Sequence, residues 1–117
     1  MVGKYPLFRR EGDDLLKVSW SKKAGAEYEH RAPWAAVEAF VGGVAAVAEP
    51  GKLWTVERVL PAAEAAYGRE LPGYRAYLIL AWLRAVDLVV KRGRNGYVAD
   101  PDALTVAEVR RHFEAMN

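Results

Sequence analysis

The amino-acid sequence predicts an α+β fold, and three features carry this prediction. Short apolar runs bounded by turn residues occur at residues 5–20 and again at 88–99. Between them lie stretches with helical spacing or helix-end signals, at 33–48, 55–67 and 74–87, and another closes the chain at 104–117. The chain has 117 residues, of which 52% are apolar, which suits a single domain with a real core.

The first 31 residues are predicted to form an N-terminal β-hairpin extension. YPLFRRE and LLKVSW have strand character, and Gly12 with Asp13 supplies a tight turn between them. The stretch at 21–32, SKKAGAEYEHRA, is interpreted as an irregular, solvated connection. Trp20, next to Lys22 and Lys23, is open to two interpretations: it stacks on a nucleic-acid base, or it caps the core or stacks on a lysine.

Helix-end signals define the first two helices of the predicted core. Pro33 suits the first turn of the helix at 33–48, and the pair Gly42-Gly43 inside it predicts the close approach of another backbone. Thr55 is the expected N-cap of the second helix and Gly68 its C-cap. Pro61 must stop or kink that helix, so one kinked helix and two shorter pieces both remain open.

The stretch at 74–87 is apolar around most of a helix circumference. Such a helix is either buried or covered by a partner. We therefore expect either that the N-terminal hairpin folds over it or that a second subunit contacts Ile79, Leu80 and Leu83.

A hairpin and a helix end the chain. Residues 88–91 and 96–99 are predicted to pair around a turn at Arg94, Asn95 and Gly96. In the closing helix, Thr105 with Glu108 three residues later matches a capping box. Three of the four tryptophans lie on or beside apolar elements and are expected in the core: Trp34, Trp54 and Trp82.

The element order over residues 33–100 resembles the winged helix-turn-helix domain. That order is helix, strand stub at 53–55, helix, helix, strand, strand, and the residues that carry the likeness are AWLRAVDLVV, the basic KRGRNG and the returning YVA. The resemblance implies a three-helix core whose last helix enters the major groove of duplex DNA, with the hairpin, or wing, against the adjacent backbone or minor groove. Residues 1–31 and the C-terminal helix at 101–117 fall outside it.

Carried onto this sequence, the resemblance implies a set of nucleic-acid contacts. Lys91, Arg92 and Arg94 would bind phosphates, Asn95 would add a hydrogen bond at the tip, and Arg75 would contact a base or a phosphate at the start of the last helix. Lys22 and Lys23 are expected to assist. For the basic cluster, the alternative is a solvated tip that keeps a sheet edge from pairing with other chains.

The leading hypothesis is a small winged-helix nucleic-acid-binding protein, a transcriptional regulator or an accessory factor of a mobile element. Its partners would be duplex DNA and a second copy of the chain. The alternative is a protein-interaction module of winged-helix shape that does not bind nucleic acid.

Composition weighs against catalysis and against a membrane location. The chain has no cysteine, and its two histidines, His30 and His112, have no third and fourth metal ligand beside them; His112 shares a helix face only with Glu108. No glycine-rich phosphate loop is present. We therefore expect neither an enzyme nor a cofactor, metal or small-molecule ligand.

No apolar run approaches the roughly 20 residues of a membrane span, and the first residues lack a signal-peptide block, so a cytoplasmic location is expected.

Overall fold

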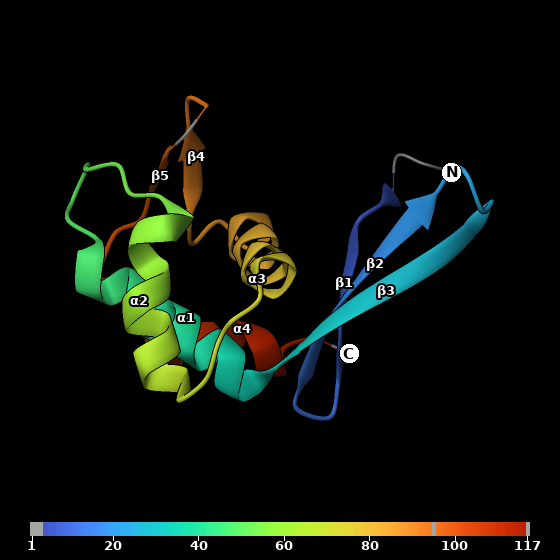
Figure 1. The fold of residues 1–117 in the computed structure, drawn as a ribbon, viewed down its shortest axis with the longest axis horizontal. Helices are drawn as coiled ribbons and strands as arrows, with labels where there is room; N and C mark the ends of the chain where they lie inside the picture. The colour runs from blue at the N-terminus through green and yellow to red at the C-terminus, as the bar shows by residue number, and fades with distance from the viewer. Residues whose placement is uncertain (1–3, 95, 117) are drawn as a thin grey trace.

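The computed structural model describes residues 4–94 and 96–116, which form an α+β structure. Within these residues there are four helices and two antiparallel sheets, one of three strands and one of two. In chain order the elements are β1 (Leu7–Glu11), β2 (Asp14–Ser21), β3 (Ala26–Pro33), α1 (Trp34–Val47), α2 (Val56–Tyr67), α3 (Gly73–Ala85), β4 (Val90–Arg92), β5 (Gly96–Val98) and α4 (Val106–Glu114). Figure 1 shows the larger sheet on one side of the helices and the β4–β5 hairpin rising from another.

The N-terminal unit is a three-stranded sheet, ordered β1-β2-β3, and not the predicted hairpin. Residues 26–33, interpreted from sequence as an irregular connection, pair with β2 from Ser21↔Ala26 to Asp14↔Pro33. The prediction was wrong because β3 is exposed along most of its length, so its sequence alternates between acidic and aromatic residues rather than between apolar and polar ones. The predicted turn at Gly12 is confirmed, with φ of 61°.

Helices α1 and α2 pack closely at Gly43, as the glycine pair predicted. A Cβ built on Gly43 would lie 2.8 Å from the carbonyl O of Val59 and 2.9 Å from the Cβ of Ala63, both on α2, whereas one on Gly42 would meet nothing within 4 Å. Pro61 lies inside α2, which is a single helix, and Gly68 ends it in the left-handed conformation. Thr55 occupies the predicted N-cap position, but its side chain makes no capping hydrogen bond.

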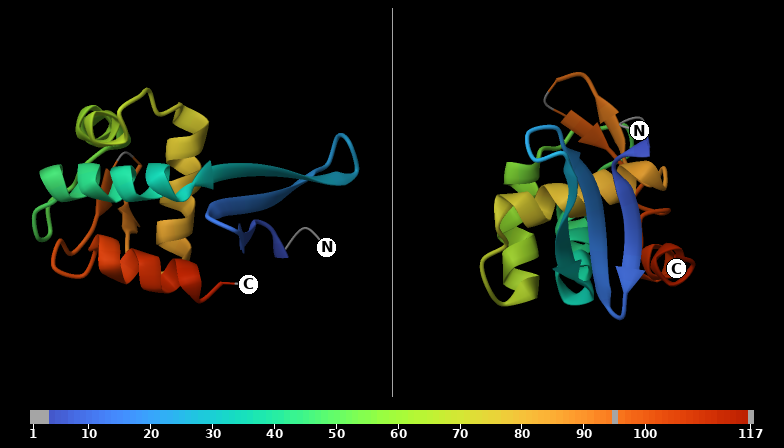
Figure 2. Two further views of the ribbon diagram at one scale, coloured as in Figure 1. Left: turned by 90° about the horizontal axis from the view of Figure 1, so that it is seen from below. Right: turned by 90° about the vertical axis from the view of Figure 1, so that its right-hand side faces the viewer.

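The apolar side of α3 is covered by the chain itself. Ile79, Leu80 and Leu83 are 0%, 2% and 0% exposed within one molecule, so the predicted dimer contact through these three side chains has no surface available. They belong to a core cluster whose other members come from every helix and from β2 and β3. Helix α3 lies across the end of α1 from which β3 leaves (Figure 2), and the sheet helps to bury it, as the first of the two sequence alternatives expected.

Helix α4 covers a further part of the core with Val109 and Phe113. Its Phe113 is 0% exposed and lies against Trp34 and Trp82, with ring centroids 5.1 Å and 6.3 Å apart. Thr105 is confirmed as the N-cap, because its hydroxyl accepts a hydrogen bond from the Glu108 amide at 3.2 Å. The second half of the capping box does not form, since the Thr105 amide donates to the Ala103 carbonyl at 3.1 Å. Trp54 and Trp82 are each 1% exposed, as expected of core residues, and Trp34 is half-buried.

Candidate nucleic-acid interface

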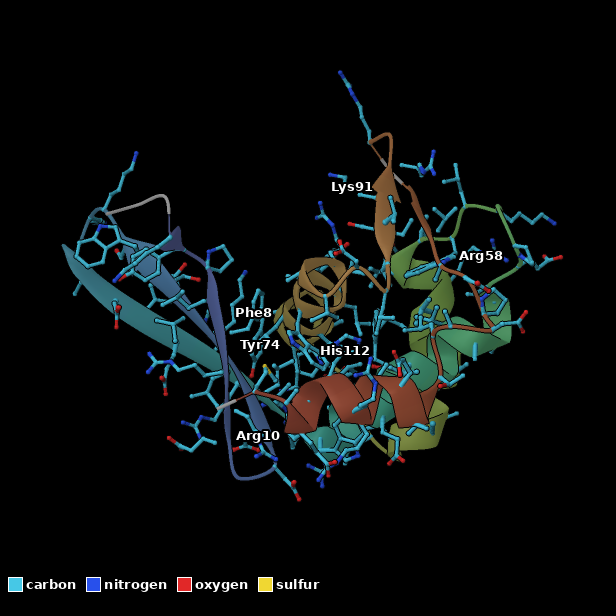
Figure 3. All side chains as sticks on the ribbon, turned by 180° about the vertical axis from the view of Figure 1, so that it is seen from behind. Phe8, Arg10, Arg58, Tyr74, Lys91 and His112 are labelled. Atoms are coloured by element: carbon cyan, nitrogen blue, oxygen red, sulfur yellow. The ribbon has the colours of Figure 1, made fainter. Side chains whose placement is uncertain are left out.

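The C-terminal hairpin, residues 88–99, carries three of the predicted contact residues, and we call it the basic hairpin. Strands β4 and β5 are antiparallel, with Val90↔Val98, Lys91↔Tyr97 and Arg92↔Gly96 opposite one another. The predicted pairing of 88–91 with 96–99 is therefore confirmed in kind, although β4 begins two residues later than predicted and β5 ends one residue earlier. Lys91, Arg92 and Arg94 are all exposed, and Figure 3 shows Lys91 on the part of the hairpin that stands clear of the helices.

Both ends of the basic hairpin are fixed to the helical core. Val89 and Ala99 are 2% and 6% exposed, so each strand leaves from a buried residue. At its base, the amide of Tyr97 and that of Trp54 each donate to the other's carbonyl at 2.9 Å, and their rings lie 5.5 Å apart. Trp54, two residues before α2, thus forms a single β-bridge that ties β5 to the helical core.

The three cations of the basic hairpin do not all point the same way. Lys91 is paired with Tyr97 and shares its face of the hairpin, while Arg92 is on the opposite face with Val90 and Val98. Arg94 and Tyr97 line a hollow of about 200 Å³ together with Tyr77 and the start of α2. Arg92 lines a separate, more apolar pocket of about 340 Å³, which also contains Asp87 and Asp100. The hairpin therefore presents positive charge on both of its faces.

Next to the basic hairpin, α3 exposes one stripe along its length. Tyr74 and Tyr77 are 53% and 50% exposed, and Arg84 continues the stripe two turns beyond Tyr77. We call Tyr74, Tyr77, Ala81 and Arg84 the α3 stripe. Partial burial raises the pKa of the Tyr77 hydroxyl above 10.0, and the nearby Glu57 and Tyr97 raise it further. Tyr77 therefore keeps its proton at neutral pH and is available as a hydrogen-bond donor.

Arg75, the predicted contact at the start of α3, lies beside the Tyr74 end of this stripe, and its side chain contacts β3. It is partly buried, its Nε donates to the carbonyl O of Arg31 at 3.3 Å, and its guanidinium lies 5.6 Å from the centre of the Tyr74 ring. These contacts tie α3 to β3, so we leave Arg75 out of the proposed contact set. Asn95, predicted at the hairpin tip, is outside the described residues.

Lys22 and Lys23 are exposed at a different tip, the turn between β2 and β3. This turn projects beyond the helices on the side of the sheet, away from the basic hairpin (Figures 1 and 2). The Ser21 side chain and backbone stabilise the turn, since Oγ accepts from the Ala24 amide at 3.1 Å and the carbonyl accepts from the Gly25 amide at 2.8 Å. The two lysines are therefore not part of the basic hairpin's surface.

Among the described residues, several cations form ion pairs, whereas those of the candidate interface do not. Arg31 pairs with three carboxylates, those of Glu11, Asp14 and Glu29, at 3.0–3.2 Å. Further pairs involve Lys52, Arg110, Arg111 and His112. By contrast, no carboxylate of the described residues is within ion-pair distance of Lys91, Arg92, Arg94, Arg84, Lys22 or Lys23.

The sequence analysis missed a second exposed set of aromatic side chains. On β3, Tyr28 and His30 form a row that continues to Tyr74 of α3, with ring centroids 5.6 Å and 5.5 Å apart. The signal was the alternation of residues 27–30, Glu-Tyr-Glu-His, which was available once the segment was treated as a strand.

Other features of the described residues give little indication of chemistry. No group of three or more metal-ligating side chains occurs within residues 4–94 and 96–116. His112 does meet Glu108 as the spacing predicted, with Nε2 and Oε2 3.5 Å apart. In the same part of the chain, no helix has the length and apolar character needed to cross a membrane.

The chain matches no protein-family model, no curated protein and no solved structure.

Proposed function

We propose that this protein binds duplex nucleic acid through the basic hairpin and the α3 stripe, in the manner of a winged-helix domain. The observation that carries the proposal is the basic hairpin: its three cations are exposed, with no described carboxylate within ion-pair distance. Exposed guanidinium and ammonium groups of this kind bind phosphates and release the counterions that surround them.

The element order supports the winged-helix part of the proposal. Helix α1 is followed by the single bridge at Trp54, then by α2, α3 and the antiparallel β4–β5 pair. In this arrangement α3 and the hairpin are adjacent, and Tyr77 and Arg94 line the same hollow. A duplex lying along the α3 stripe would therefore also meet the basic hairpin.

The positive charge on both faces of the basic hairpin is suited to binding in a groove of duplex nucleic acid. When the hairpin lies in a groove of the duplex, Lys91 and Arg94 face the phosphates nearer α3, and Arg92 faces the phosphates across the groove. Arg84 of the α3 stripe adds a fourth contact. Four phosphate contacts predict a slope of log K against log salt of about −3 to −4.

The α3 stripe offers little for reading bases. Its polar members are two tyrosines and Arg84, and it has no asparagine or glutamine, the residues that form bidentate pairs with adenine. We therefore propose binding through the backbone, with weak sequence preference and an affinity that depends strongly on salt.

A charge-matched pair of triple variants tests the proposal. In the first, Lys91, Arg92 and Arg94 are replaced by alanine; in the second, Arg9, Arg69 and Arg111, which lie outside the proposed interface, are replaced. Binding to a random duplex is measured by fluorescence anisotropy over a range of salt concentrations. We expect the first variant to lose most of its affinity. The slope of its log K against log salt should become shallower, at about −1, because each lost phosphate contact removes about 0.9 from the magnitude of the slope. The second variant should keep the wild-type slope.

Two results would refute the proposal. One is duplex binding that does not depend on salt, and the other is an equal loss of affinity in both triple variants, which would indicate a general effect of net charge. The alternative function is a protein-interaction module of winged-helix shape. Its main support in the sequence was the apolar third helix, whose large apolar side chains pack inside the single chain. Homodimer formation and a cytoplasmic location remain predictions.

A further inference from the structure

The three-stranded sheet has all the carboxylates of its strands on one of its two faces. Directly paired residues share a face, so Phe8, Lys17 and His30 are together, as are Ser19 and Tyr28. We call these five residues the aromatic face. Every carboxylate of the three strands belongs to the opposite face: Glu11, Asp14, Glu27 and Glu29.

The carboxylates of the opposite face already have partners in the sheet or in the residues just before it. Arg31 pairs with Glu11, Asp14 and Glu29, and the Tyr5 hydroxyl donates to Glu27 at 2.6 Å. The aromatic face therefore has no negative side chain of its own strands, and it includes Lys17. The same sheet ends in the exposed turn that carries Lys22 and Lys23. The aromatic face is thus suited to an anion.

Aromatic rings on this face are exposed and adjacent. Tyr28 is 46% exposed, His30 is exposed, and Tyr74 on α3 is 53% exposed. The His30 ring lies between the two tyrosines, at 5.6 Å from Tyr28 and 5.5 Å from Tyr74. Figure 3 shows Tyr74 and Phe8 between α3 and the sheet, so the row runs from the projecting part of the sheet toward the helices.

We infer that the aromatic face binds single-stranded nucleic acid, whose bases stack on Tyr28, His30 and Tyr74 while Lys17, Lys22 and Lys23 contact its phosphates. Exposed aromatic rings beside cations are the combination that holds unpaired bases without sequence preference. A duplex cannot use this surface in the same way, since its bases are already stacked on one another. The inference goes beyond the proposed function, because it requires neither the basic hairpin nor a duplex.

The test uses the full chain and fluorescein-labelled oligothymidylate and oligouridylate of about 15 nucleotides. Wild type is compared with Tyr28→Ala, His30→Ala and Tyr28→Phe in fluorescence anisotropy at low salt. We expect wild type to bind both oligonucleotides, each alanine variant to bind about tenfold more weakly, and Tyr28→Phe, which keeps the ring, to bind like wild type. Circular dichroism verifies that each variant is folded, which is expected because both side chains are exposed.

Trp20 supplies the matched control. It is an aromatic residue of the same sheet and 37% exposed, but it lies on the opposite face, stacked on Tyr5 with centroids 5.9 Å apart. Trp20→Ala should leave oligonucleotide binding unchanged. The triple alanine variant of Lys91, Arg92 and Arg94 should also retain it, even where duplex binding is lost, so the two proposals fail separately.

Several outcomes would overturn the inference. The inference is wrong if wild type binds neither oligonucleotide at low salt. It is also wrong if the alanine variants of Tyr28 and His30 bind like wild type. An equal loss of affinity with Trp20→Ala would show that oligonucleotide binding does not depend on the aromatic face. If light scattering instead detects a dimer that Tyr28→Ala dissociates, the occupant of this face is a second copy of the chain.

Discussion

Replacing Gly42 and Gly43 separately by alanine tests how α1 and α2 are held together. The two glycines are neighbours in α1, but only Gly43 faces α2. An added Cβ at Gly43 would lie 2.8 Å from the Val59 carbonyl O and 2.9 Å from Val59 Cγ1, and one at Gly42 has no neighbour within 4 Å. The Val59 oxygen belongs to the α2 backbone, so relief requires the two helices to move apart.

The magnitude follows from comparing the two variants. Alanine is favoured over glycine inside a helix by about 0.5–1 kcal/mol, and this gain is common to both positions. Gly42→Ala should therefore stabilise the protein by about that amount. Gly43→Ala also has the cost of overpacking, typically about 1–3 kcal/mol. The free energy of unfolding of Gly43→Ala should thus be lower than that of Gly42→Ala by about 1–3 kcal/mol.

Urea denaturation followed by circular dichroism at 222 nm, the standard helix wavelength, measures both free energies. The difference should be visible as a shift of the midpoint with little change in the slope m. If Gly43→Ala proves as stable as Gly42→Ala, then α1 and α2 do not approach each other at this point and the account of their packing is wrong.

Three further predictions concern helix ends. Asp87 follows α3 in the left-handed conformation, at φ of 63°, while the Leu88 amide donates to the Leu83 carbonyl; Asp87→Gly should raise the free energy of unfolding by about 1 kcal/mol, and a lower Tm would contradict this. Thr105→Ala removes the cap of α4 and should cost about 1 kcal/mol in urea denaturation, whereas Thr105→Ser should cost much less. The Arg111 guanidinium, which donates to Glu108 at 2.8 Å, holds the pKa of that carboxyl below 4.5. A carboxyl whose pKa is lowered in the folded state stabilises the fold at pH values above its ordinary pKa, and this stabilisation is lost as the pH falls. The Tm difference between wild type and Glu108→Gln should therefore shrink below pH 4.5, and a constant difference would count against the ion pair.

Local signals in the sequence were sufficient to predict much of the fold. The Thr105 cap, the left-handed Gly68 and the close approach at Gly43 each depend on a few neighbouring residues, and each is present in the structure. The antiparallel hairpin after α3 was predicted for the same reason, from apolar residues on both sides of a turn.

The features that depend on distant parts of the chain could not be predicted in the same way. Strand β3 has little apolar alternation, and its pairing is decided by β2 and by the turn that ends at Gly25. The tie from Arg75 to the Arg31 carbonyl joins residues 44 positions apart. The apolar character of α3 showed that Leu80 and Leu83 must be covered, but not that the same chain covers them.

The central claim is that duplex nucleic acid meets the basic hairpin and the α3 stripe, and backbone amide chemical shifts measured by NMR during a titration with duplex test it most directly. We expect the largest shift changes at Lys91, Arg92 and Arg94 and at Tyr77 and Arg84, with α4 almost unaffected. Changes concentrated on α4, or spread evenly over the surface, would contradict the account.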